Sequence, residues 1–397
     1  MLTTLPFAIF YSTLQAIAAF GVTILLARQI DPLIFGVYIL SLSWALMLVQ
    51  ITDAALEQCF TSYKYSFGLD IYELYSNSIF LKLFLCCCCF GFLLIGDLFF
   101  SVQVPVTTLI FMVPLFYPVV IFEIREKLVL FAKILLAEKL FFFAVLLVYL
   151  QFFEMSNGIY AMYFTSSVVS LLFQYWILKL PLPQIQHFRV SLILHYVMRY
   201  WPVYVGMFSL MVIGIGSRII MEHKLGIAVF ASVSIVFTLT NSINIVNSQI
   251  EKYIRPIISK AASDSDNNAI KLFLSDYFKY YILPLVVGCY LVGLLSDWIV
   301  NVIFGPSWVQ SGSYLKILIY MVVWTSIIRI ADLVLVAVGK VKFGLVLSTI
   351  VATALTGFLL MLTDRTDVST YLIAIMSSAA INACILVMYA VRKTWVQ

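Results

Sequence analysis

Long apolar stretches follow one another along this chain, and they restrict its fold more than any other feature. Each is close to the roughly 20 mostly apolar residues that a helix needs to cross a bilayer. None alternates strictly between apolar and polar residues, as the roughly 10-residue strands of a membrane barrel do. We expect twelve membrane-spanning helices, at residues 6–27, 34–52, 79–101, 104–123, 134–153, 158–180, 200–221, 226–249, 281–304, 314–339, 343–363 and 370–391.

Composition agrees with this interpretation. Of 397 residues, 63% are hydrophobic and only 11% are charged. Soluble proteins carry about 25% charged residues, so this chain has too few to cover a water-exposed surface. The sequence therefore predicts an all-α integral membrane protein embedded in a lipid bilayer.

Basic residues predict the orientation, because Lys and Arg near helix ends gather on the cytoplasmic side. The N-terminal MLTTLP carries no basic segment of a signal peptide, so we expect the first helix to be retained. With twelve helices, the loops opposite the termini hold only four basic residues, Arg28, Lys224, Lys316 and Arg365. Most of the other basic residues, from Lys64 in the second connection to Lys393 near the C-terminus, fall on the side of the termini. We expect both termini in the cytoplasm, and the net charge of +5 reflects topology rather than nucleic-acid binding.

The connection over residues 250–280 is one of the two longest on the cytoplasmic side. Asp266 or Asn267 could cap a short helix there, with Leu272 and Phe273 on its apolar face. We expect this segment to lie on the membrane surface.

Metal and catalytic chemistry have no visible residues in the sequence. The run CCCC at 86–89 cannot converge on one metal, because consecutive helical residues point about 100° apart. The histidines at 187, 195 and 223 match no ligand spacing, and there is no phosphate-binding glycine loop or GxSxG turn. We expect no metal, no cofactor and no enzymatic activity.

Arg329 and Asp332 stand near the middle of a predicted membrane helix. A charge at the bilayer centre costs about 2.5–3.5 kcal/mol on insertion scales, so such side chains face a partner or a water-filled cavity. Three residues apart on one helical face, they could form an internal pair that fixes helix packing. They could equally line a polar lumen, where Arg329 binds an anionic group.

Other polar residues in the predicted helices are candidates for the same lumen. Side chains of this kind also serve as hydrogen-bonding contacts between membrane helices, and both roles stay open. The candidate residues along a substrate path are Arg329, Asp332, Arg218, Lys82, Asn241, Asn244, Ser248 and Gln15.

Weak internal repeats predict two related halves. GFLLIGD (91–97) resembles VGLLSD (292–297), and ARQIDPLIFGVYILSLS (27–43) resembles SRIIMEHKLGIAVFASVS (217–234). Such parallel repeats are typical of transporters that bind substrate at the repeat interface. We expect two pseudo-symmetric six-helix lobes, residues 1–185 and 186–397, around a central cavity.

The stretch LLARQIDPLIFGVYIL resembles the first loop and second helix of the polysaccharide flippases. These proteins translocate O-antigen and exopolysaccharide repeat units and belong to the multidrug/oligosaccharidyl-lipid/polysaccharide exporter superfamily. Further similar motifs follow in order over essentially the whole chain: SRIIMEHKLGIAVFASVS, IRPIISKA (254–261), IFGPSW (303–308) and AVGKVKFG (337–344). The chain departs from the family pattern at Asp31, Ser217 and Ala228.

The resemblance implies a flippase of the bacterial inner membrane, in polysaccharide or lipopolysaccharide biosynthesis. It would move undecaprenyl-pyrophosphate-linked oligosaccharide to the periplasmic leaflet by alternating access, coupled to an ion gradient. A polysaccharide polymerase and a chain-length regulator are the implied protein partners. Arg suits the phosphates, and Asn and Gln amides suit sugar hydroxyls.

Three alternatives differ in chemistry. A multidrug exporter of the same fold should offer organic cations an acidic cavity, whereas the predicted first helix contains no acid. A flippase for cell-wall precursors generally has helices beyond twelve. A membrane-bound polymerase or ligase typically has a large extracytoplasmic loop with basic residues, and the outer loops here are short.

Overall fold

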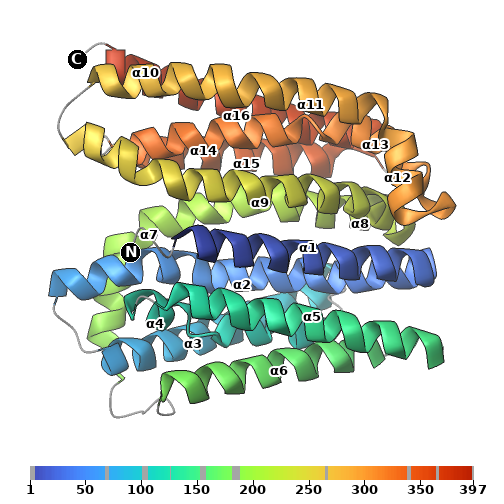
Figure 1. Cartoon of the computed structure of the whole chain (residues 1–397), viewed down its shortest axis with the longest axis horizontal. Helices are drawn as coiled ribbons and strands as arrows, with labels where there is room; N and C mark the ends of the chain where they lie inside the picture. Colours follow the sequence, from blue (N-terminus) through green and yellow to red (C-terminus); the bar gives the residue numbers. More distant parts are fainter. Residues whose placement is uncertain are drawn as a thin grey trace. The chain divides into compact units, whose positions relative to one another are not determined.

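The computed structural model describes residues 5–67, 71–100, 106–125, 127–152, 158–180, 188–263, 267–337, 341–363 and 366–395. All regular structure in these ranges is helical (Figure 1). Helices satisfy every backbone hydrogen bond within one segment, which hydrocarbon surroundings demand. The prediction of an all-α fold is confirmed.

The helices of the first half have these bounds: α1 (Leu5–Gln29), α2 (Pro32–Phe67), α3 (Ile71–Phe100), the 3₁₀ helix η1 (Val106–Phe116), α4 (Val119–Ile124), α5 (Leu128–Phe152) and α6 (Gly158–Leu178).

The helices of the second half have these bounds: α7 (Val190–Met211), the π-helix η3 (Val212–Gly216), α8 (Ser217–Leu225), α9 (Ile227–Ser263), α10 (Asn267–Tyr277), the π-helix η4 (Phe278–Ile282), α11 (Leu283–Leu294), α12 (Ser296–Phe304), the 3₁₀ helix η5 (Pro306–Trp308), α13 (Ser311–Leu318), α14 (Met321–Ala337), α15 (Val341–Met361) and α16 (Val368–Trp395).

Each predicted membrane span overlaps helix in the structure. Within the described residues, seven helical stretches are long and apolar enough to cross a membrane, and three shorter helices are also apolar. The seven are 32–49, 158–178, 227–244, 268–294, 311–335, 342–361 and 368–392. The number twelve and the orientation of the termini stay predictions.

The helix predicted within residues 250–280 is not a separate element in the structure. The helix at 267–277 forms, but it continues through η4 directly into α11 (Figure 1). Residues 268–294 therefore make one continuous helical stretch that is long and apolar enough to cross a membrane, and the membrane-surface position of its first part stays a prediction. The apolar residues after Asn267 allow this continuation, because no Gly or Pro interrupts them before Pro284.

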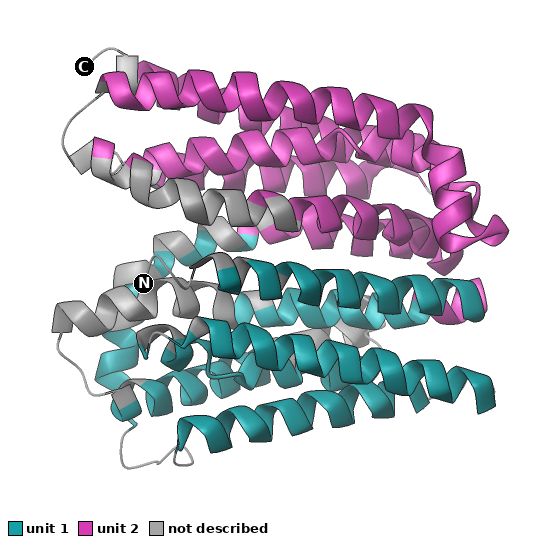
Figure 2. Cartoon of the chain, in the orientation of Figure 1, with its two compact units in different colours: residues 1–30, 37–208 teal, residues 31–36, 209–397 magenta. Residues whose placement is uncertain are grey.

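The described chain contains two compact units (Figure 2). Unit 1 is residues 1–30 and 37–208, and unit 2 is residues 31–36 and 209–397. The change from one unit to the other falls inside α7. The two lobes predicted at 1–185 and 186–397, their pseudo-symmetry and the cavity between them stay predictions.

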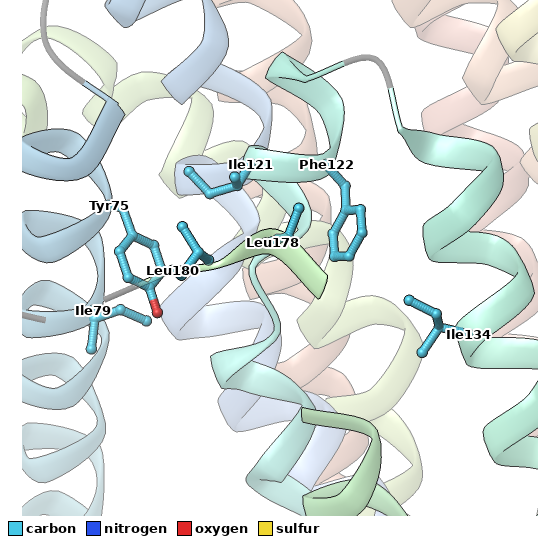
Figure 3. Close-up of a cluster of buried hydrophobic side chains, with 7 residues drawn as sticks. All are labelled: Tyr75, Ile79, Ile121, Phe122, Ile134, Leu178 and Leu180. Carbon is cyan, nitrogen blue, oxygen red and sulfur yellow. The ribbon is translucent and has the colours of Figure 1, made fainter. Parts of the chain in front are cut away.

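In unit 1, α1 and α6 pack along α5, and α6 also packs on η1. A core of apolar side chains joins α3, α4, α5 and the end of α6 (Figure 3). Its buried members are Tyr75, Ile79, Ile121, Phe122, Ile134, Leu178 and Leu180. This packing fixes the short helix α4 just beyond the break that follows η1.

Unit 2 contains the start of α2, which packs closely on α9. A Cβ atom at Gly36 would lie 2.8 Å from Cγ1 and 3.0 Å from the carbonyl oxygen of Ile227, so only glycine fits there. Beside it, Phe35 packs edge-on against Trp308, with 5.3 Å between ring centroids. Gly36 and Trp308, which both belong to the motifs that resemble polysaccharide flippases, therefore have a role in packing.

Candidate functional site

Unit 1 contains a broken helix. The 3₁₀ helix η1 contains Pro114 and ends at Phe116, and α4 begins at Val119 after two non-helical residues. A break of this kind frees backbone carbonyls, which must find other donors in an apolar environment. Lys82 of α3 supplies one, because its Nζ donates to the carbonyl oxygen of Leu115 at 2.9 Å.

Lys82 is only 4% exposed. It was predicted as a substrate-path residue from its charge inside an apolar run. The structure places it at the broken helix, where its ammonium binds a backbone carbonyl. Its contact with substrate stays a prediction.

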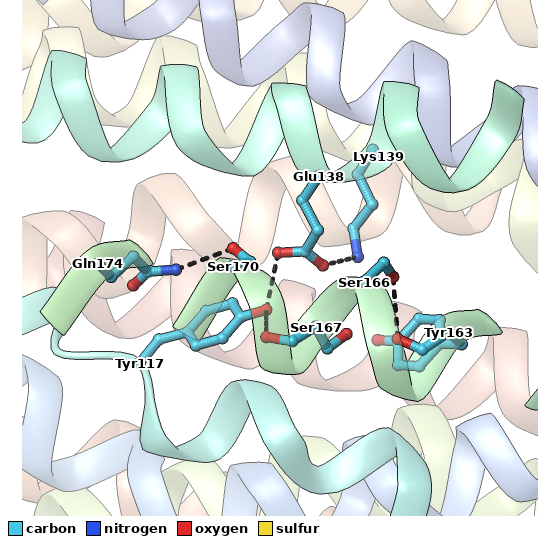
Figure 4. A network of polar contacts seen from close by, with 8 residues as sticks. All are labelled: Tyr117, Glu138, Lys139, Tyr163, Ser166, Ser167, Ser170 and Gln174. Carbon is cyan, nitrogen blue, oxygen red and sulfur yellow. Dashed lines mark hydrogen bonds and ion pairs between the residues drawn. The ribbon is translucent and has the colours of Figure 1, made fainter. Parts of the chain in front are cut away.

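A second charged group lies beside Tyr117, one of the two non-helical residues of this break (Figure 4). Glu138 of α5 is 5% exposed, and Tyr117 donates its hydroxyl hydrogen bond to Glu138 Oε2 at 2.7 Å. Lys139 Nζ lies 2.8 Å from Glu138 Oε1 and also lies over the ring of Tyr163, 5.1 Å from its centroid. The carboxylate therefore has an ionic partner and a neutral hydrogen-bond donor in one buried place.

Helix α6 completes this network with small polar residues. Gln174 Nε2 donates to Ser170 Oγ at 3.2 Å, and the backbone oxygen of Ser167 accepts a 3.3 Å bond from Tyr117. Ser167 Oγ and Gln174 Oε1 are buried and have no hydrogen-bond partner among the described residues. A buried carboxylate beside spare oxygen atoms can hold a proton or a small cation. We call these residues, Tyr117, Glu138, Lys139, Ser167, Ser170 and Gln174, the ionic cluster.

Unit 2 has a polar seam of a different kind between α9 and α14. Asn247 is 4% exposed, and its Nδ2 donates to Ser326 Oγ at 2.6 Å and to Asn244 Oδ1 at 3.0 Å. Thr325 Oγ1 donates to the same Asn244 oxygen at 2.9 Å, and Tyr281 of η4 donates to Asn247 Oδ1. We call Asn244, Asn247, Thr325 and Ser326 the amide seam. All of its side chains are uncharged.

Arg329 and Asp332 lie on α14 one and two turns beyond Thr325, on the same side of the helix. Both side chains are half-buried. Asp332 points toward α15, because a Cβ atom at Gly344 would lie 3.2 Å from Asp332 Oδ1. The structure thus groups Arg329 and Asp332 with Asn244, as residues of neighbouring helices in unit 2.

Arg218 lies on α8 and is 8% exposed. Its Nε donates to the carbonyl oxygen of Gly214 in the π-helix η3 at 3.3 Å, and its guanidinium carbon lies 4.8 Å from the ring centroid of Phe237. No carboxylate among the described residues pairs with it. Arg218 thus stabilises the irregular turn of η3, and its contact with substrate stays a prediction.

The remaining predicted residues have separate places. Gln15 is half-buried on α1 in unit 1, and Asn241 is exposed on α9 in unit 2. Ser248 also lies on α9, but its side chain is outside those that the structure describes. None of these positions tests a substrate contact.

Sequence reasoning missed the ionic cluster and three of the four residues of the amide seam. Glu138 and Lys139 had a usable signal, since they are adjacent charges inside an apolar run. The partners Tyr117, Ser167 and Gln174 gave none, because such residues are common in membrane helices. Asn247, Tyr281 and Ser326 come together only through the fold.

Candidate metal clusters of three or more His, Cys, Asp or Glu residues are absent from the described part of the chain. The free cysteines described there include Cys86, Cys87 and Cys88 on α3. The prediction that the CCCC run binds no metal is not tested further.

The sequence matches no protein-family model and no curated protein. The structure, in contrast, matches solved transporters over nearly its whole length. It is similar to a multidrug resistance MATE family transporter of the MOP superfamily in its inward-facing conformation, with 15% identity, a TM-score of 0.63, and coverage of 98% of this chain and 94% of that one. The chain and this transporter share one fold.

Two further matches support this fold. The outward-facing conformation of a MATE family transporter matches with 12% identity, a TM-score of 0.60, and coverage of 99% and 94% of the two chains. A MOP superfamily transporter from Pyrococcus furiosus Vc1, described by the reverse polarity of its binding pocket, matches with 14% identity, a TM-score of 0.55, and coverage of 98% and 95%. The solved transporters that share this fold thus include an inward-facing and an outward-facing conformation.

The chain thus has the multi-pass membrane fold of these solved transporters. The predicted superfamily, in which polysaccharide flippases stand beside multidrug exporters, agrees with it at the level of the fold. The flippase subtype and its substrate are matters for proposal.

Proposed function

We propose that this protein is a lipid-linked oligosaccharide flippase. It moves undecaprenyl-pyrophosphate-bound O-antigen or exopolysaccharide repeat units from the cytoplasmic to the periplasmic leaflet of the bacterial inner membrane. The MOP fold supports a cycle between inward- and outward-open states, because solved transporters with this fold adopt both. Both termini lie in the cytoplasm, and a polymerase and a chain-length regulator act on the product.

The observation that carries this proposal is the half-buried guanidinium of Arg329 beside the amide seam. Arginine binds phosphate through two parallel hydrogen bonds, and the amides and hydroxyls one turn away suit sugar oxygens. Arg218 and Lys82 are two more buried cations, whereas α1 contains no acidic residue. This charge pattern favours a pyrophosphate over an organic cation.

The ionic cluster is the candidate for coupling to an ion gradient. Protonating Glu138 removes its negative charge beside the broken helix between η1 and α4 and leaves the Lys139 ammonium without its ionic partner. A buried charge favours the helix arrangement in which it has an ionic or hydrogen-bonding partner, so a change of that charge shifts the equilibrium between two arrangements. Protonation and deprotonation of Glu138 can in this way couple an ion gradient to the movement of the glycolipid.

A multidrug exporter is the second candidate function. The observation in its favour is that two of the structural matches described above are multidrug transporters. Against this alternative, the Pyrococcus furiosus protein of the same fold is described as having a binding pocket of reverse polarity and a different function. Efflux of ethidium by cells or vesicles containing the protein would favour the multidrug alternative.

The test is Arg329→Ala in cells that depend on this protein for surface polysaccharide. Losing charge-assisted bonds worth about 1.5–3 kcal/mol should lower translocation roughly 10- to 100-fold. Lipid-linked repeats should accumulate on the cytoplasmic face while membrane insertion is unchanged. Arg329→Lys should retain part of the activity, and Arg392→Ala, at an exposed position of α16, is the matched control. Wild-type surface polysaccharide in Arg329→Ala would contradict the proposal.

A further inference from the structure

The amide seam meets a row of aromatic rings on α10 and η4. Phe273, Tyr277 and Tyr281 follow one another at intervals of four residues and are all half-buried. Ring centroids are 6.3 Å apart for Phe273 and Tyr277, and 5.1 Å apart for Tyr277 and Tyr281. The three rings, which we call the ring row, form a continuous aromatic strip that ends at Asn247.

The π-helix η4 keeps this strip straight. In a regular α-helix, four residues turn the chain about 40° beyond a full turn, so two such steps would move Tyr281 about 80° away from Phe273. The wider π turn rotates less per residue and offsets this drift. Residues 278–282 form that turn, which ends the row beside the seam.

Tyr281 does not have the contacts of an ordinary membrane-interface tyrosine. Interfacial Tyr side chains direct their hydroxyls to the lipid headgroups. The Tyr281 hydroxyl instead donates to Asn247, whose amide is buried and binds Ser326 on α14. The hydroxyl of Tyr281 is therefore fixed at the seam, while the residue as a whole is only half-buried.

The seam fixes the direction of the Asn244 amide. Its Oδ1 accepts hydrogen bonds from both Thr325 and Asn247, while its Nδ2 donates to none of the described residues. The side chain is partly exposed, so the free end of the amide is the donor end. Asn241, one helical turn earlier on α9, has an exposed amide as well.

A pyranose ring has the matching chemistry. Its C–H face is apolar and stacks on an aromatic ring, and its hydroxyl and carbonyl oxygens accept hydrogen bonds from amides. We propose that Tyr281, Asn241 and Asn244 bind the uncharged sugar of the transported glycolipid, separately from the pyrophosphate at Arg329. This inference rests on the proposed flippase function and assigns the two parts of its substrate to two neighbouring groups in unit 2.

The test compares two probes on full-length protein in lipid nanodiscs. One is farnesyl pyrophosphate, and the other is farnesyl pyrophosphate linked to a disaccharide of N-acetylglucosamine. The wild type should bind the sugar-bearing probe about tenfold more tightly, the gain expected from one stacked ring and one or two hydrogen bonds. Tyr281→Leu and Asn244→Leu should abolish this difference and bind the bare probe normally.

Matched variants separate binding from folding. Tyr280→Leu changes the neighbouring, 67% exposed tyrosine and should keep the tenfold difference. Tyr281→Phe retains the ring and should keep most of it, whereas Asn241→Leu, at an exposed position, should reduce it. Arg329→Ala should weaken both probes equally.

The outcomes distinguish the two proposals. A sugar-dependent difference that is absent from the wild type, or that persists in both Tyr281→Leu and Asn244→Leu, overturns this inference. If the wild type binds neither probe, the flippase proposal fails together with it. Loss of the difference with intact binding of farnesyl pyrophosphate supports both.

Discussion

The ionic cluster of unit 1 and the amide seam of unit 2 bury polar groups in opposite ways. In unit 1, Glu138 and Lys139 form an ion pair next to a helix that is broken at Tyr117. In unit 2, Asn244 and Asn247 connect intact helices through neutral amides and hydroxyls, and the charges of Arg329 and Asp332 stay partly exposed. The two clusters thus lie between helices in both units but differ in the kind of polar group that they bury.

This difference suggests a division of tasks. A desolvated ion pair responds strongly to protonation, because neutralising the carboxylate leaves the ammonium unpaired. A neutral seam keeps its hydrogen bonds at any pH in the physiological range and can present fixed donors to a ligand. The ionic cluster is thus suited to coupling, and the amide seam to binding.

The largest expected effect follows from breaking the ion pair. Glu138→Leu leaves the Lys139 ammonium in an apolar place and should lower the free energy of unfolding by about 3–5 kcal/mol. Denaturant unfolding in detergent micelles measures this change. The double variant Glu138→Leu/Lys139→Leu should recover most of the stability and still lack coupled transport. A double variant as unstable as the single one would show that the pair is not the cause.

Breaking the neutral seam should cost less. Asn247→Leu leaves the hydroxyl of Tyr281 without its acceptor and removes the bonds to Ser326 and Asn244. We expect a loss of about 1–3 kcal/mol, the cost of unpairing buried neutral groups. The same unfolding assay measures it, with Asn301→Leu at an exposed position of α12 as the control. A loss equal to that of Glu138→Leu would remove the energetic contrast between the units.

The close approach of Gly344 to the Asp332 carboxylate should have the next largest effect. In Gly344→Ala the added methyl would lie 3.2 Å from Asp332 Oδ1, so this carboxylate oxygen must move by a few tenths of an ångström. We expect a destabilisation of about 1 kcal/mol and a clear loss of translocation, because Asp332 and Arg329 share a helical face. Gly357→Ala, with open space around its Cβ position, should change neither property.

The smallest effect belongs to an exposed ion pair. Lys316 Nζ lies 2.8 Å from Asp297 Oδ2, with both side chains about half exposed. Lys316→Ala should change the free energy of unfolding by less than about 1 kcal/mol, and less still at high salt. A loss comparable to that of Glu138→Leu would mean that desolvation does not govern the ranking of these pairs.

The helical segments could be predicted from the sequence, because each apolar run permits only a helix in a membrane. The same logic identified Lys82, Arg218 and Arg329 as charges that require partners. It applied equally to Glu138 and Lys139, which had the same signal and were not singled out.

Other features were beyond sequence reasoning for a physical reason. Asn247 bonds to residues 34 and 79 positions away, so the seam exists only once α9, η4 and α14 have packed. The break at Tyr117 and the π turns depend on side chains such as Lys82 and Arg218 that satisfy the freed carbonyls. Hydropathy contains no information about such pairings.

Translocation by purified protein tests the central claim most directly. Proteoliposomes would contain a fluorescent polyprenyl-pyrophosphate-linked oligosaccharide in both leaflets, with accessibility to external dithionite as the measurement. The account predicts that wild-type protein exposes the inner-leaflet pool and that Arg329→Ala exposes it at least 10-fold more slowly. Equal rates for the two proteins, or no translocation by a wild type that transports ethidium, would contradict it.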